Sequence, residues 1–220
     1  MAEEQREKVF REQLKGLCPQ VDQVRLMLAA ARHAFNRHSQ AQLEEMARLH
    51  KTFTLDIDPW FEKVKKDLRR ASADDKAYLL KLEKVLTELE LMADKVAGLE
   101  EHLRYKAKKG LILSDKDVFS INNVFSKLGG FLQTLVDIFQ INDAALKAYV
   151  LEETQKLAGS SFQSGTAHET GMMDTPGQPD AWSVYLAILE VSREVVKHLE
   201  DIVKSLDDLI DKTLADSVEM

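Results

Sequence analysis

The sequence has little of what disulfide-bonded, membrane-spanning or nucleic-acid-binding proteins need. Its single cysteine, Cys18, excludes an internal disulfide framework and a cysteine-rich zinc site. No run of about 18 apolar residues is present, so we predict no transmembrane helix. The first residues are charged rather than apolar, so we predict no signal peptide. The formal net charge of −7 disfavours nucleic acid as a partner, because nucleic-acid-binding proteins normally carry a basic excess.

Proline and glycine, which interrupt helices, are also scarce. Four prolines and nine glycines in 220 residues favour long helices, and 45% hydrophobic residues supply a core for them. Apolar residues recur every three or four positions in several stretches, which places them on one face of a helix. The clearest stretch, 78–102, carries Leu79, Leu82, Val85, Leu86, Leu89, Met92, Ala93, Val96 and Leu99. The fold class predicted from these patterns is all-α.

Breaking and capping residues divide the chain into segments. Gly16 and Pro19 separate a charged N-terminal helical extension, residues 1–16, from the helices that follow. Gly110 ends the central helix, and Ser114 is the predicted N-cap of the next one. Pro59 predicts a kink or a boundary inside a helical stretch. Residues 159–180 are rich in Gly, Ser, Thr and Pro and predict a long flexible loop.

An internal repeat is predicted at an offset of 104 residues. With this shift Leu17 falls on Ile121, Val21 on Phe125, Val24 on Leu128, Leu28 on Leu132, Phe35 on Phe139 and Ser39 on Asp143. The match weakens further along, where Leu89 falls on Arg193 and Asp94 on His198. We therefore predict two tandem three-helix units packed as antiparallel helical bundles, at 17–110 and 111–220, with the flexible loop at 159–180 inside the second.

The third helix of each unit carries a ladder of charged side chains. The first ladder is Glu90, Asp94 and Glu101, and the second is Glu190, Glu194 and His198. Carboxylates one helical turn apart can bind one hard cation together, and a mixture of carboxylate and imidazole suits a transition metal. Glutamate is abundant in this sequence, which favours a solvated acidic face as the explanation of each ladder, and metal binding stays open as the alternative.

Catalytic motifs are missing from the sequence. It has no nucleophile elbow, no glycine-rich phosphate loop and no dinucleotide fingerprint, so we predict no enzyme. The basic run 104–109 is either a solvated helix C-terminus or a surface for phosphate or an acidic membrane. His33, His38 and His50 are expected at the surface. Gly129 and Gly130 either weaken their helix or allow another helix to approach closely.

The first ladder resembles a family signature. Glu90-Leu-Met-Ala-Asp94, followed by Gly98 and Glu101, is similar to the Glu-x-x-x-Asp signature of the PhoU family of phosphate-response regulators. In that family an asparagine and a glutamate follow on the same face, and Gly98 stands here in the asparagine position. The second half has Glu194-Val-Val-Lys-His198, with histidine in place of the aspartate. The resemblance covers about residues 17–210 and includes the order of the helices.

The resemblance implies a non-enzymatic cytoplasmic accessory protein that regulates phosphate transport or phosphate signalling. Its expected partner is a phosphate transporter or its sensor kinase, and its expected location includes the inner face of the membrane. The resemblance also implies metal ions on the two ladders, with iron, zinc and magnesium as candidates. A homodimer is the default oligomeric state. Two alternatives stay open: a metal-binding helical bundle of ferritin-like type, and a metal-free helical scaffold or adaptor.

Overall fold

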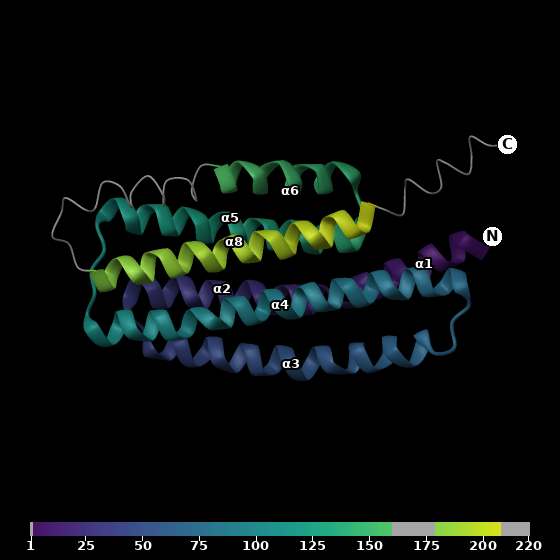
Figure 1. Cartoon of the computed structure of the whole chain (residues 1–220), viewed down its shortest axis with the longest axis horizontal. Coiled ribbons are helices and arrows are strands. Elements are labelled where there is room, and N and C mark those ends of the chain that lie inside the picture. Colours follow the sequence, from purple (N-terminus) through teal and green to yellow (C-terminus); the bar gives the residue numbers. More distant parts are fainter. Residues whose placement is uncertain (1, 160–178, 208–220) are drawn as a thin grey trace.

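Long helices lie side by side along the long axis of the molecule (Figure 1). The computed structural model describes residues 2–159 and 179–207. Its helices are α1 (Ala2–Gly16), α2 (Cys18–Arg37), α3 (Gln40–Leu68), α4 (Ala73–Lys109), α5 (Asp115–Ile141), α6 (Ala144–Leu157) and α8 (Pro179–Asp207). No strand occurs within these ranges, so the all-α prediction is confirmed. None of the helices described is long and apolar enough to cross a membrane.

The predicted loop at 159–180 lies almost entirely outside the described residues. Residues 160–178 are not described, and Pro179 and Asp180 already belong to α8. Helix α8 is described as far as Asp207.

Side-chain caps determine where the helices begin. Ser39, Ser72, Ser114 and Asp143 each accept a hydrogen bond from a backbone N–H in the first turn of the helix that follows. Such a bond satisfies one of the donors that a helix N-terminus leaves without an intrahelical partner. The N-cap predicted at Ser114 is therefore confirmed.

The internal repeat is visible in the backbone at the ends of α2 and α5. His38 and Asn142 stand 104 residues apart, and both adopt the left-handed conformation with φ 51°. The residue after each, Ser39 or Asp143, caps the next helix. The two units therefore share the same turn. In each, a residue in the left-handed conformation ends one helix, and the polar side chain after it caps the next helix.

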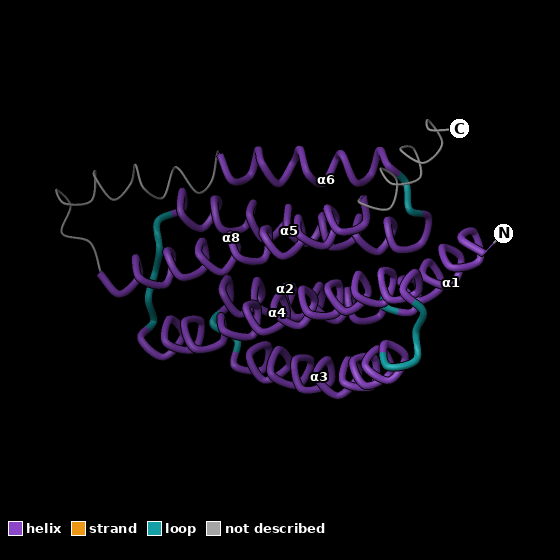
Figure 2. The backbone as a smooth tube through the Cα atoms, turned by 45° about the vertical axis from the view of Figure 1, so that its right-hand side comes forward, coloured by secondary structure: helices purple, strands orange, loops and turns teal. Residues whose placement is uncertain are grey.

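Two three-helix units share one core. Helices α2, α3 and α4 form the first unit, and α5, α6 and α8 form the second. Between the units α2 packs on α5 and α4 on α8, while α3 and α6 lie on the outer sides (Figure 2). The rings of Phe35 and Phe125 meet across α2 and α5 with centroids 6.2 Å apart. The prediction of two tandem three-helix units is confirmed, and a single cluster of buried residues joins them.

Helix α1 packs into this core along one side. Phe10 and Leu14 are buried, and α1 contacts α4 and α5. At its end, a Cβ placed on Gly16 would lie 2.7 Å from Cη2 of Trp60 in α3. Only a residue without a side chain allows this approach, so Gly16 has a packing role in addition to ending the helix.

Pro59 lies inside α3, which continues without interruption to Leu68. The alternative of a helix boundary at this proline is therefore wrong. Phe53 and Ile57 before the proline and Val64 after it are all buried on the same face. Burial of this stripe offsets the backbone hydrogen bond that proline removes.

Gly129 and Gly130 lie inside α5, and neither allows a close helix approach. No atom lies within 4 Å of a Cβ built on either residue, so that interpretation is wrong. We expect Gly129→Ala and Gly130→Ala each to raise the free energy of unfolding by roughly 1 kcal/mol, because alanine has the higher helix propensity and meets no neighbour. Urea denaturation measures this change. A loss of stability in either variant would contradict the open space seen around it.

Candidate functional site

Helix α4 lies between α3 and α8 and presents different charged residues to each. Each residue turns the helix by about 100°, so Glu88 and Asp94, which are six positions apart, lie about 120° apart around its axis. Glu88 and Lys95 face α8, whereas Asp94 faces α3. The acidic residues of α4 therefore belong to two separate groups.

The first ladder lies on the side of α4 that faces α3. His50 Nε2 lies 2.8 Å from Asp94 Oδ1, which joins the two helices. Glu90 is half-buried, and burial raises the pKa of its carboxyl above the usual range. The neighbouring carboxylates of Asp94 and Asp58 raise that pKa further. Glu101 is exposed further along the helix, so it does not join this group.

The second ladder contributes to the contact between the two units. His198 is 7% exposed, and its Nδ1 lies 2.7 Å from Glu88 Oε2. The other ring nitrogen of His198 is buried and has no hydrogen-bond partner in the described structure. Glu194 forms a longer ion pair with Lys95, at 3.8 Å. Glu190 is exposed and pairs with a neighbour on its own helix, Arg193, at 2.7 Å.

These contacts do not bring the six ladder residues together. A metal site of protein ligands usually needs three or more donors around one point. Within residues 2–159 and 179–207, no three His, Cys, Asp or Glu side chains are placed to hold a metal ion. The observed arrangement thus does not fit a metal centre, and metal binding stays a prediction.

His50 and Glu88 are the contact residues that the sequence did not indicate. Each is a single charged residue on a helix full of charges, and its role depends on the helix packed against it. The expectation that His50 lies at the surface is only partly met, because it is half-buried against Asp94. Either residue can be identified as a contact residue only when the position of its helix relative to the neighbouring helix is known.

Lys106 is a second unexpected feature. We predicted a basic run at a solvated helix end or on a binding surface, but Lys106 is only 5% exposed. Its Nζ donates a hydrogen bond to the carbonyl oxygen of Phe35 at 2.9 Å, contacts His38 Nε2, and lies 4.9 Å from the centre of the Phe35 ring. Burial lowers the pKa of Lys106 to about 8. Lys106 therefore connects the end of α4 to the end of α2.

His38 shares this environment. It is half-buried rather than fully exposed, so the expectation of a surface histidine is wrong in this respect. Burial lowers its pKa, and the nearby charge of Lys106 lowers it further. A charged ammonium group beside an imidazole favours the neutral ring. The pair therefore holds one positive charge rather than two at neutral pH.

Comparisons with solved structures show which known proteins share this fold. No protein-family model and no curated protein matches this sequence. Among solved structures, PhoU from Pseudomonas aeruginosa matches with a TM-score of 0.74 and 16% identity, over 96% of this chain and 98% of that one. The phosphate transport system regulatory protein PhoU from Streptococcus pneumoniae matches with a TM-score of 0.57 and 13% identity, over 93% of each chain. The chain therefore has the fold of these PhoU proteins, as the sequence resemblance predicted.

Proposed function

We propose that this chain regulates phosphate transport or phosphate signalling by binding a partner protein. The observation that carries the proposal is the extent of the match in fold: it covers 96% of this chain and 98% of PhoU from Pseudomonas aeruginosa. Both three-helix units are thus included, rather than one common bundle. The Streptococcus pneumoniae neighbour is a regulatory protein of a phosphate transport system, which supports the same role for this chain.

The charged residues support a binding role rather than catalysis. Asp94 of α4 contacts His50 on α3, Glu88 of α4 contacts His198 on α8, and Lys106 holds the end of α2. Each therefore stabilises the packing of helices. A ferritin-like site would need inward-facing glutamate and histidine ligands from four helices, and no observation favours it over the regulatory role. The homodimer and the metal-free scaffold also stay open as predictions.

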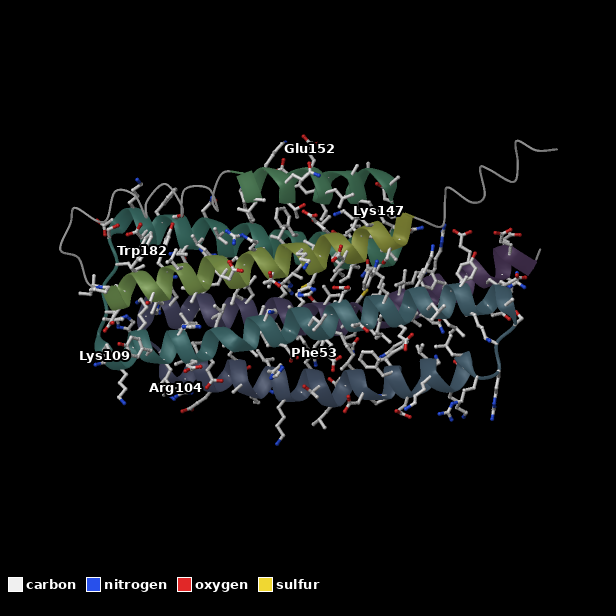
Figure 3. The ribbon with its side chains drawn as sticks, in the orientation of Figure 1. Phe53, Arg104, Lys109, Lys147, Glu152 and Trp182 are labelled. Atoms are coloured by element: carbon white, nitrogen blue, oxygen red, sulfur yellow. The ribbon has the colours of Figure 1, made fainter. Side chains whose placement is uncertain are left out.

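The turn between α4 and α5, together with the beginning of α5, supports a location at the cytoplasmic face of a membrane. Ile112 and Phe119 are 78% and 76% exposed, which makes them the most exposed large apolar residues of the described chain. Lys108 and Lys109, at the end of α4, are also exposed. Figure 3 labels Lys109 at one end of the helical bundle. Apolar side chains flanked by lysines fit an anionic lipid surface, where the proposed partner, a phosphate transporter or its sensor kinase, is embedded.

Deletion of the gene in its own organism tests the proposal. We expect phosphate uptake in phosphate-rich medium to rise and the genes of the phosphate-starvation response to be expressed, because the restraint on both is lost. Uptake of radioactive phosphate and transcript levels measure the two effects. Reintroduction of the wild-type gene should restore both. Unchanged uptake and unchanged transcription in the deletion strain would contradict the proposed function.

Variants in the same strain test the role of the exposed turn. Ile112→Ser combined with Phe119→Ser should fail to restore normal uptake, because it removes the apolar contact with the membrane. Leu55→Ser is the matched control: Leu55 is 64% exposed on α3, so the same kind of change is made on another surface. Full restoration by the double variant would refute the proposed role of the turn while leaving the regulatory function intact.

A further inference from the structure

A pocket of about 470 Å³ lies between α2 and α5. Helix α2 contributes Arg25, Arg32, His33 and Arg37 to its lining, and α5 contributes Phe125 and Gly129. No carboxylate lines this pocket. The volume is within the range of about 300–1,000 Å³ typical of small-molecule sites.

Arg32 is held in place by a hydrogen bond from only one of its guanidinium nitrogens. Its Nε donates a hydrogen bond to Asn122 Oδ1 at 2.9 Å, and Asn122 also exchanges two hydrogen bonds with Asn36. These amides fix the guanidinium between the two helices. Its two terminal nitrogens make no hydrogen bond within the described chain, so they can bind an anion in the pocket.

The other arginines differ in how much of their charge is available. Arg37 is exposed and makes no hydrogen bond or ion pair with any described residue. Arg25 lies at the far end of the pocket and forms an ion pair with Asp22 at 2.9 Å. Positive charge is therefore concentrated at the end formed by Arg32 and Arg37, which leaves the Arg25 end closer to neutral.

The middle of the pocket is apolar and open. Leu28 and Phe125 are almost fully buried and form its inner wall. A Cβ built on Gly129 would meet no atom within 4 Å. Glycine at this position thus leaves space in the pocket, although it weakens the helix. The site therefore combines a cationic end with an apolar floor.

The internal repeat shows that this charge is not a general property of the fold. At the 104-residue offset, Arg25 corresponds to Gly129, Arg32 to Val136 and Arg37 to Ile141. The repeated position in the second unit is thus without basic residues.

The spacing of the arginines limits the size of the ligand. With a rise of 1.5 Å per residue, Arg25 and Arg32 are separated by about 10 Å along α2 and Arg25 and Arg37 by about 18 Å. A single inorganic phosphate bound by Arg32 and Arg37 would leave the apolar floor and the Arg25 end of the pocket uncovered. We propose that this pocket binds a phosphorylated organic molecule of about nucleotide size. Its phosphate contacts Arg32 and Arg37, and its organic part covers the floor beside Gly129. This site does not depend on the proposed function in phosphate regulation.

Isothermal titration calorimetry of the full chain tests the proposal with AMP, ATP and ribose 5-phosphate. Adenosine, ribose and orthophosphate are the comparison ligands. We expect at least one phosphorylated compound to bind at least tenfold more tightly than both orthophosphate and its own unphosphorylated counterpart. Equal binding of orthophosphate would overturn the role of the organic part. Absence of saturable binding by all three phosphorylated compounds would overturn the proposal.

Two pairs of variants connect binding to this pocket. Arg37→Gln should weaken binding at least tenfold, whereas Lys127→Gln, which removes the same charge on the side of α5 near Glu153, should not. Gly129→Leu should abolish binding by filling the floor, whereas Gly130→Leu, on the exposed adjacent position, should leave it unchanged. Circular dichroism confirms that each variant is folded. Equal effects within either pair would overturn the assignment of the site.

Discussion

The free energy of unfolding is expected to rise by up to about 3 kcal/mol as the pH increases from about 8 to 10.5, and Lys106→Met should remove this rise. Burial lowers the pKa of Lys106 from 10.5 to about 8 in the folded protein. One pKa unit corresponds to about 1.4 kcal/mol, so a shift of this size is worth about 3 kcal/mol. Urea denaturation of both proteins at several pH values measures the difference.

The direction of this effect follows from proton binding. Below pH 8 Lys106 is protonated in both states, so its contribution does not change with pH. Between pH 8 and 10.5 the unfolded chain holds a proton that the folded protein has released, so stability rises with pH. Above about 10.5 neither state holds it. Lys106 is thus still charged in the folded protein at neutral pH, but burial makes this charge less stable than in the unfolded chain, despite its contact with the C-terminus of α2.

Lys108→Met is the matched control, because Lys108 is exposed in the same turn of α4. This variant should follow the wild-type curve. Tyr78, whose pKa is raised by burial, lowers the stability at the alkaline end, but it is unchanged in all three proteins. The difference between curves therefore isolates Lys106. Parallel curves for wild type and Lys106→Met would show that the ammonium group is not desolvated as the structure indicates.

The helices were predictable because their limits depend on nearby residues. Ser114 caps α5 because its hydroxyl oxygen accepts a hydrogen bond from the backbone N–H of Asp117, three positions away. Gly110 ends α4 in the left-handed conformation that glycine favours. Pro59 was different. Its effect on α3 depends on the apolar stripe that Ile57 and Val64 bury against the rest of the core. Tertiary packing outweighed a local rule at this position.

Lys106 was partly predictable from the same periodicity. Val96, Leu99 and Leu103 are buried at spacings of three and four, and the next position on that stripe is Lys106. Its charge, rather than its position, suggested a solvated residue. A lysine that continues an apolar stripe is thus a candidate for burial, and the acceptor for its ammonium group must come from another helix.

The candidate site was less predictable because its contacts cross between helices. The ladder at Glu90 and Asp94 follows from spacing within α4, but its neighbour His50 is 44 residues away in sequence. The contact between Glu88 and His198 spans 110 residues and depends on how α8 is placed against α4. The pocket beside Gly129 likewise needs arginines from α2. No spacing within one helix contains this information.

The contact between Glu88 and His198 should contribute strongly to stability, because it is nearly buried and joins the two units. We expect His198→Leu to lower the free energy of unfolding by about 3 kcal/mol, since Glu88 then keeps a poorly solvated charge without its partner. Glu88→Leu should cost about 2 kcal/mol, because the buried ring of His198 loses its one hydrogen bond. The double variant should return to within about 1 kcal/mol of the wild type. Urea denaturation of all four proteins gives the coupling energy.

The same variants separate a simple side-chain contact from a metal site. If His198 only pairs with Glu88, a chelator should leave the stability of the wild type unchanged, and elemental analysis should find no metal that depends on His198, Glu90 or Asp94. Stoichiometric metal lost in Glu90→Ala combined with Asp94→Ala would instead support the ladder prediction.

Glu190→Leu provides the baseline for the stability measurements, because its pair with Arg193 is exposed and should contribute less than about 1 kcal/mol. Additive losses in the Glu88 and His198 double variant would show that the two side chains stabilise the protein independently. Their contact would then add nothing to the packing of α4 against α8.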